Sequence, residues 1–370
     1  MLIIMSRLFN FYVYLPIVNT PPANQDVWIL CIISGVLDAI LCFPIMYLVI
    51  KFKDLSLLDY YKLIIGKIPS FIWGIILAIF MLFQIIIAFN LVTIFLEKVI
   101  IPETPYLIML VFIAIVCYYS VQKGFVVLGR VAEMIVPFIV FSVVFFTLLN
   151  IGNMNFKNLL PILSDSNWKD ILFGSINISF RFYQIYFIAI FSPMLQDKKA
   201  VVNVFKCSLI ILSILYTVMT ITCIASFGVT LSQNYNFLYF SFMRQIDLFR
   251  FIERIEFIGV MGWLLGAFIC ISLHLFALLT LLNQTIKTQI NSKIQLIIIF
   301  LIVIFVSKYT PISESYILSE IMSYKILPYI QSIFNIVIPS IICIIYLIRR
   351  KSIENKLAQK SQMPNSNQTN

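Results

Sequence analysis

Long apolar runs are the feature of this sequence that most restricts how the chain can fold. A helix needs about 20 apolar residues to cross the hydrocarbon core of a bilayer. Only 11% of the 370 residues are charged, against about 25% in a typical soluble domain. The sequence therefore predicts an all-α integral membrane protein with about ten transmembrane helices. The runs lie near residues 3–19, 27–50, 71–96, 105–121, 131–150, 171–192, 203–227, 256–282, 294–307 and 327–348.

The charges between the apolar runs predict how the helices are oriented. Cytoplasmic loops of membrane proteins concentrate Lys and Arg. With the N-terminus inside, every segment predicted to face the cytoplasm has a net positive charge, and no external segment does. In this count Arg7 belongs to the first cytoplasmic segment. We therefore expect both termini in the cytoplasm, and we attribute the net charge of +10 to topology and anionic membrane lipid, not to a nucleic-acid partner.

The runs and the loops between them predict a single transmembrane domain over residues 1–350. The stretch 351–370 is polar and rich in Gln, Asn and Ser, which predicts a disordered cytoplasmic tail. The segment at about 229–254 is long and amphipathic, so one or two external surface helices are expected there. No cleavable signal peptide is evident, because the segment before Pro16 lacks a small-residue cleavage site and runs into the first span.

The reactive side chains do not indicate an enzyme. The seven cysteines are scattered through apolar runs without a CxxC pair, and His274 is the single histidine. A disulfide framework, a metal site and a bound cofactor are therefore not expected. Clustered carboxylates and an activated nucleophile are also missing from the sequence pattern.

Several short motifs follow one another along the chain in a characteristic order. The most specific is Lys123-Gly124 followed by Gly129-Arg130-Val131-Ala132-Glu133. The others are Pro16 followed by Gln25-Asp26 and Trp28, Ser56 to Tyr60 ending in Gly66-Lys67, Pro102 to Pro105, Asn158 to Pro161, Asp197 to Lys199, and Glu253 to Glu256 leading to Trp263 and Gly266. In this order the chain resembles the endospore germination permease family, the B subunits of nutrient germinant receptors. The resemblance runs in register over residues 10–285 and more loosely to about 348.

The resemblance implies a permease fold of the amino acid–polyamine–cation transporter superfamily. Its two inverted repeats of five helices would span about 1–150 and 165–350, and an odd number of spans in each repeat agrees with the charge count. In such folds the first helix of each repeat breaks near the midplane and turns backbone groups towards a ligand. Here these helices are the first and sixth runs. The resemblance further implies a location in the inner spore membrane and partnership with A-type and C-type receptor subunits.

Arg181 is the strongest single candidate for ligand binding. It lies about ten residues from each end of the sixth run, which is roughly 15 Å from either interface at 1.5 Å per residue. A charge at that depth costs about 2.5–3.5 kcal/mol on insertion scales and normally faces a cavity or a partner. We hypothesise that Arg181 lines the central cavity and binds an anionic ligand group. The alternatives are a misplaced span or a structural ion pair, for which Asp38 in the second run is one possible partner.

The residues around Arg181 depart from the pattern of the resembled family. The segment reads Ser179-Phe180-Arg181-Phe182-Tyr183-Gln184. Arg181 and Tyr183 occupy the positions of the family's helix-breaking Pro and Gly, and Gln184 occupies its acidic position. This departure weakens the expectation that the sixth run is unwound in the usual way. It indicates an unusual ligand or a receptor that has lost part of its site.

Other polar residues in the apolar runs are candidates for the same site. In membrane helices such side chains often only bond a neighbouring helix, with about 0.6 kcal/mol on average, so helix packing is the competing interpretation. The family's lysine in the eighth run corresponds to Cys270 here. The further ligand-binding candidates are Asn10, Tyr12, Pro16, Asn19, Gln84, Ser272 and His274, and the candidates for structural or coupling roles are Arg130 with Glu133, and Glu253 with Glu256.

Two functions fit the resemblance. The leading interpretation is a sensor that binds a small nutrient germinant, such as an amino acid, and signals to partner subunits. The alternative is an active amino-acid transporter of the same superfamily, because fold alone does not decide function. A membrane scaffold also stays open, given the altered motifs in the first and sixth runs. Uptake of radiolabelled amino acids would favour the transporter, and neighbouring genes for A-type and C-type subunits would favour the sensor.

Overall fold

The structure is a computed structural model that describes residues 1–13, 15, 17, 20–22, 24–194, 198–235, 237–246, 254–286, 291–322 and 325–362. These residues form helices and no strand, which confirms the all-α class. The longer elements are α1 (Leu2–Val13), α3 (Val27–Leu41), α4 (Phe43–Lys51), α5 (Leu57–Ile65), α6 (Lys67–Phe95), α7 (Tyr106–Gln122), α8 (Phe125–Leu149), α9 (Trp168–Phe180), α10 (Ile185–Phe191), α11 (Lys198–Asn234), α12 (Leu238–Arg244), α13 (Glu256–Ile286), α14 (Ser292–Tyr309), α15 (Ser315–Met322), α16 (Leu327–Ser332) and α17 (Ile338–Gln362). Two π-helical turns, η1 (Leu96–Ile100) and η6 (Ile333–Val337), extend α6 and join α16 to α17.

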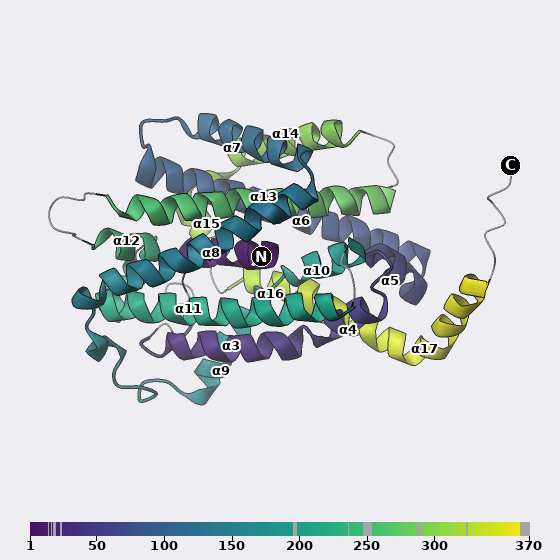
Figure 1. The fold of residues 1–370 in the computed structure, drawn as a ribbon, viewed down its shortest axis with the longest axis horizontal. Helices are drawn as coiled ribbons and strands as arrows, with labels where there is room; N and C mark the ends of the chain where they lie inside the picture. The colour runs from purple at the N-terminus through teal and green to yellow at the C-terminus, as the bar shows by residue number, and fades with distance from the viewer. Residues whose placement is uncertain are drawn as a thin grey trace.

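The long helices lie side by side, as expected for a membrane bundle (Figure 1). Among the described residues, six helical stretches are long and apolar enough to cross a membrane, and the bent pair α3–α4 brings the number to seven. The six are α6 with η1, α8, α11, α13, α14, and the stretch from α16 into α17. The predicted total of ten spans and the inverted repeats stay predictions.

The short helix α1 lies inside the bundle and not at its edge. It packs against α13 and also contacts α8, α11 and α12. Ile4, Met5, Leu8 and Phe9 are all buried, as expected for a mostly apolar helix that is surrounded by other helices. Gly266 of α13 permits this close approach, because a Cβ there would lie 2.5 Å from Cε of Met5.

The loop between α8 and α9 is attached to the start of α3. Gln25 donates from Nε2 to the carbonyl oxygen of Pro161 at 3.0 Å and to Oδ2 of Asp165 at 2.7 Å. Oδ1 of Asp26 accepts from the backbone N–H of Leu163 at 3.0 Å. The Gln25-Asp26 motif of the sequence therefore fixes a loop that is far away along the chain.

Two stretches differ from the predicted boundaries. The helix α17 continues to Gln362, so its last turns lie in the segment that composition predicts to be a disordered tail. In the amphipathic segment 229–254 the described residues contain the short helix α12, whose Leu238, Tyr239, Phe242 and Met243 are buried against the bundle.

Candidate ligand-binding site

The predicted break in the sixth apolar run is present. The helix α9 ends at Phe180 and α10 begins at Ile185, so Arg181 to Gln184 connect them. Turn-like bonds close the gap, from the N–H of Phe182 to Ser179 O at 3.0 Å and from the N–H of Ile185 to Phe182 O at 3.3 Å. The break forms without Pro or Gly, so other parts of the molecule must stabilise it.

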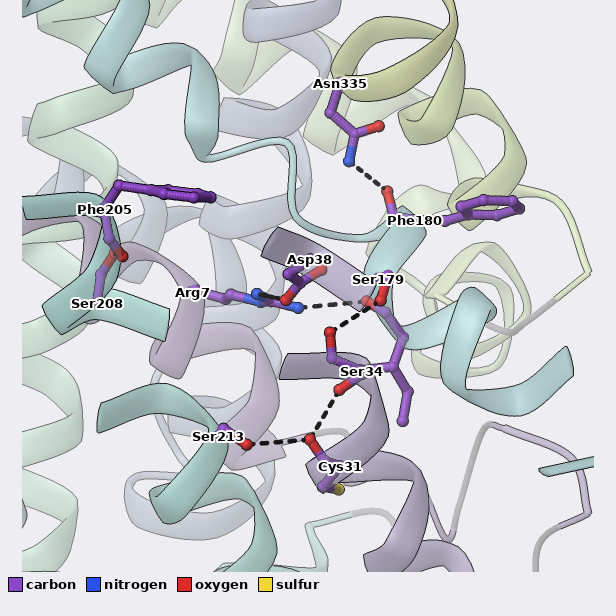
Figure 2. Close-up of polar contacts among 11 residues, drawn as sticks. Arg7, Cys31, Ser34, Asp38, Ser179, Phe180, Phe205, Ser208, Ser213 and Asn335 are labelled. Carbon is purple, nitrogen blue, oxygen red and sulfur yellow. Dashed lines mark hydrogen bonds and ion pairs between the residues drawn. The ribbon is translucent and has the colours of Figure 1, made fainter. Parts of the chain in front are cut away.

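Three distant segments stabilise the end of α9, where helix carbonyls lack partners within the helix. Figure 2 shows Nδ2 of Asn335 donating to Phe180 O at 3.0 Å and Nη2 of Arg7 directed at Ile178 O at 3.4 Å. The hydroxyl of Ser179 donates to Ser34 O on α3 at 3.2 Å. A cation at a helix C-terminus is favourable, because that end carries partial negative charge. The break is thus held by α1, α3 and η6.

Arg7 forms a buried ion pair with Asp38. Its Nη1 lies 2.5 Å from Oδ2 of Asp38, and the two side chains are 5% and 2% exposed. The guanidinium also lies over the ring of Phe182, 4.0 Å from the centroid. One expectation is therefore wrong, because α1 carries Arg7 into the bundle and not into a cytoplasmic segment. The ion pair of Asp38 with Arg181, which the sequence left open as an alternative, is not formed, because Asp38 pairs with Arg7.

A small polar cavity lies beside the break. It offers about 50 Å³ to the centres of water-sized molecules. About 10–15 Å³ on this measure is the least that holds one water, so the cavity has room for a few water molecules. The described residues that line it include two arginines and no acidic side chain. They are Arg7, Asn10, Gln84, Ile178, Arg181, Tyr183, Gln184, Tyr216, Leu327 and Gln331.

Three glutamine amides in the cavity wall have atoms without a hydrogen-bond partner among the described residues. Gln84, Gln184 and Gln331 are 3%, 1% and 4% exposed. The atoms concerned are the Nε2 donor of Gln84 and the Oε1 acceptors of Gln184 and Gln331. Buried polar side-chain atoms are nearly always hydrogen-bonded. The cavity is therefore suited to a ligand, or to water, with both donors and acceptors.

His274 orients the cavity residue Tyr183. The Tyr183 hydroxyl lies 2.9 Å from Nε2 of His274, and Nδ1 of the same ring lies 2.7 Å from Cys270 O. A carbonyl oxygen can only accept, so Nδ1 carries a proton. In the neutral ring Nε2 then accepts from the tyrosine hydroxyl. Cys270 packs its sulfur 3.5 Å from Oγ of Ser6 on α1.

The structure brings five of the twelve predicted ligand-binding residues into the cavity wall. Those that line the cavity are Asn10, Gln84, Arg181, Tyr183 and Gln184. Ser179 and Phe180 lie at the break but outside the lining, and the Phe180 ring packs edge-on against Tyr329.

Of the remaining predicted residues, the structure describes Ser272 and the backbone of Tyr12. Ser272 is buried on α13 near Cys117 of α7, so it is not part of the cavity lining. Pro16, Asn19 and the side chain of Tyr12 fall outside the described residues.

The predicted coupling residues are only partly as expected. Arg130 and Glu133 are both exposed on α8, and the ion pairs among the described residues do not include them. Glu256 lies in the first turn of α13, as expected for a carboxylate at a helix N-terminus. Glu253 falls outside the described residues.

Sequence reasoning missed five residues of the cavity lining. Two of them carried a usable signal, because Arg7 and Gln331 are polar side chains within apolar runs. Tyr216 is one of 18 tyrosines and has no such signal. The apolar residues Ile178 and Leu327 cannot be told from ordinary core residues.

The fold and the site define a multi-pass α-helical membrane protein with a broken helix at a central polar cavity. The sequence profile of the spore germination protein family matches residues 1–317. The chain therefore belongs to this family, which confirms the resemblance. The chain is 25% identical over 317 residues to spore germination protein XB of Bacillus anthracis, covering 84% of this chain and 85% of the relative.

Two further relatives match over shorter stretches. Spore germination protein GerQB of Bacillus cereus is 28% identical over 149 residues, covering 40% of each chain. Spore germination protein KB of Bacillus subtilis (strain 168) is 23% identical over 187 residues, covering 47% of this chain and 48% of the relative.

Proposed function

We propose that the chain is the membrane subunit of a spore germinant receptor. It binds a small nutrient germinant, an amino acid, and signals with A-type and C-type partner subunits. Membership of the spore germination protein family supports this function. The same membership supports a location in the inner spore membrane, and the loop charges support an orientation with both termini in the cytoplasm.

The observation that carries the ligand proposal is the charge of the cavity wall. The described lining residues include two arginines, Arg7 and Arg181, and no acidic side chain, so the wall is positively charged. Arg7 is paired with Asp38 outside the lining, and we assign the guanidinium of Arg181 to the ligand carboxylate. Charge-assisted bonds of this kind are about twice as strong as neutral ones.

The glutamine amides would receive the rest of an amino acid. The free donor of Gln84 suits the second carboxylate oxygen, and the acceptors of Gln184 and Gln331 suit an ammonium group. Ile178 and Leu327 provide an apolar wall for a small side chain. The cavity holds only a few water molecules, which is less space than an amino acid needs. The residues at the break must therefore move when the ligand enters.

The test is germination of spores that carry an in-frame deletion, complemented with Arg181→Ala or Arg181→Lys. Loss of one buried charge-assisted hydrogen bond, about 1.5–3 kcal/mol, is expected to raise the half-maximal germinant concentration by about ten- to a hundredfold. Arg244→Ala, an exposed arginine at the end of α12, is the matched control. An unchanged dose-response for Arg181→Ala at normal protein abundance refutes the assignment.

The same strains separate the sensor from the transporter. A transporter would accumulate the radiolabelled amino acid in a heterologous host that lacks the partner subunits. A sensor would show no uptake there, and its germination response would require the A-type and C-type genes. Uptake that follows the same Arg181 dependence would replace the sensor by the transporter.

A further inference from the structure

The π-helical turn η6 has an unusual position, because it faces the break in the neighbouring span. It joins α16, which carries the cavity residues Leu327 and Gln331, to the long helix α17. A π-helical turn interrupts the regular α-helical ladder and is frequent at functional sites. Phe334 and Asn335 of this turn are buried.

Adjacent residues of η6 hold the two halves of the broken span. Asn335 donates from Nδ2 to Phe180 O, at the last residue of α9, at 3.0 Å (Figure 2). The carbonyl oxygen of Phe334 accepts from the hydroxyl of Tyr186, in the first turn of α10, at 2.8 Å. A shift of α9 relative to α10 must therefore break one of these two bonds or move η6.

The side chain of Phe334 fixes η6 against α6. Its ring stacks on Phe80 with the centroids 3.9 Å apart and on Trp73 at 5.3 Å. Phe80 also makes an edge contact with the cavity residue Tyr183 at 5.5 Å. The turn is thus packed between the cavity wall and α6, and not loosely attached to the break.

The helix α17, which follows η6, is attached to α5 and α4 at the end far from η6. Arg349 donates from Nη1 to Ile64 O of α5 at 2.6 Å, and Glu354 pairs with Lys51 of α4 at 2.7 Å. Beyond these contacts α17 leaves the bundle (Figure 1). The loop charges predict that this end lies in the cytoplasm. One continuous helical segment therefore connects the cavity wall, the break and this face of the protein.

We propose that η6 is the coupling element that links the ligand site to the far end of α17. Asn335 and Tyr186 are positioning residues, because they fix the two half-helices and not the ligand itself. A ligand that moves α9 against α10 changes the position of η6 and, through it, of α17. Coupling of this kind is reciprocal, so a change at α17 also alters the break. The part of this inference that concerns ligand binding rests on the proposed germinant site.

The first test needs no ligand and uses hydrogen exchange on the full chain in nanodiscs. Asn335→Ala is expected to speed exchange about fivefold at the amides of residues 182–187 and also at 346–355, the equivalent of one hydrogen bond. Tyr186→Phe, which removes a single oxygen atom, is expected to act in the same direction. If Asn335→Ala does not fold, the exchange rates measured in Tyr186→Phe decide the test. Faster exchange confined to residues 333–337 refutes the proposal.

Asn150 provides the matched control. It is also a buried asparagine whose Nδ2 donates to a distant backbone carbonyl, that of Phe242, at 2.9 Å. Asn150→Ala is expected to change exchange near Phe242 and to leave residues 182–187 and 346–355 as in the wild type. If it loosens these two segments as strongly as Asn335→Ala, the effect is general destabilisation and the proposal fails.

The second test adds L-alanine as the probe. In the wild type it is expected to slow exchange at residues 182–187 and to change exchange at 346–355. In Asn335→Ala the effect at the break is expected to persist while the effect at 346–355 is lost. A wild type in which L-alanine changes exchange at neither segment counts against the proposed site as a site for L-alanine, and the ligand-free test still decides the coupling. An unchanged α17 response in the variant refutes the coupling.

Discussion

Replacing Arg7 by methionine tests the buried ion pair that stabilises the break. The change keeps most of the side-chain volume but leaves the Asp38 carboxylate buried and without its cation. Breaking a buried pair from one side typically costs about 3–5 kcal/mol. Arg7 also lies 4.0 Å from the ring centroid of Phe182, and a desolvated cation–π contact contributes about 2 kcal/mol. We therefore expect a loss of unfolding free energy at the upper end of that range.

The converse change is expected to cost less. Asp38→Asn keeps an oxygen that can accept from Arg7, and the guanidinium retains its contacts with Ile178 O and Phe182. The loss of unfolding free energy for Asp38→Asn should be about 3 kcal/mol, the lower end of the range for breaking a buried ion pair. Replacing both partners with apolar residues, Arg7→Met with Asp38→Leu, should recover part of the loss, because no charge is then left buried.

Equilibrium unfolding of the purified chain in mixed micelles measures these free energies. The partly exposed pair Lys51–Glu354 supplies the control, and Lys51→Met should have a much smaller effect, because exposed pairs are screened by water. The reasoning is refuted if Arg7→Met costs no more than this control. It is also refuted if the double variant loses the full sum of the two single losses.

Two smaller predictions concern the loop between α8 and α9 and its packing. The hydrogen bond from Gln25 lowers the pKa of Asp165 below its ordinary value. This contact therefore stabilises the fold above the ordinary carboxyl pKa, and the stabilisation is lost as the pH falls below that value. Gln25→Leu should raise the pKa of Asp165, which NMR titration measures. Gly174→Ala should destabilise the fold by about 1–3 kcal/mol, because the Cβ of the alanine would lie 2.2 Å from Pro21 O. Gly129→Ala is the control and should have little effect, because a Cβ there would have nothing within 4 Å. Equal unfolding free energies for the two variants would contradict this prediction.

The membrane class could be predicted because its signal is local, whereas the break in the sixth run was implied by the family resemblance. The length of each apolar run follows directly from the thickness of the bilayer. The depth of Arg181 within the sixth run marked the site, and the structure places this residue in the cavity wall. Gln84 followed from a similar argument, since a polar side chain within an apolar run needs a polar environment, and Gln184 followed from the resemblance, which places it at the family's acidic position.

The contacts that make the break could not be predicted, because they join residues far apart in sequence. Asn335 lies 155 positions from Phe180, and Arg7 lies 171 from Ile178. Arg7 was assigned to a loop because a charge near the start of an apolar run resembles a flanking residue. Its burial depends on α1 being surrounded by other helices, which no local pattern reports.

The pairing of Arg7 with Asp38 has a consequence for how the chain enters the membrane. Each charge alone would oppose insertion of its helix by about 2.5–3.5 kcal/mol. Because α1 and α3 lie close together in the sequence, the two charges can neutralise each other while the residues that follow are still being synthesised. The two helices therefore favour entry as a pair, and Ile178, whose carbonyl Arg7 also contacts, joins them only after three further long helices, α6, α7 and α8, have been made.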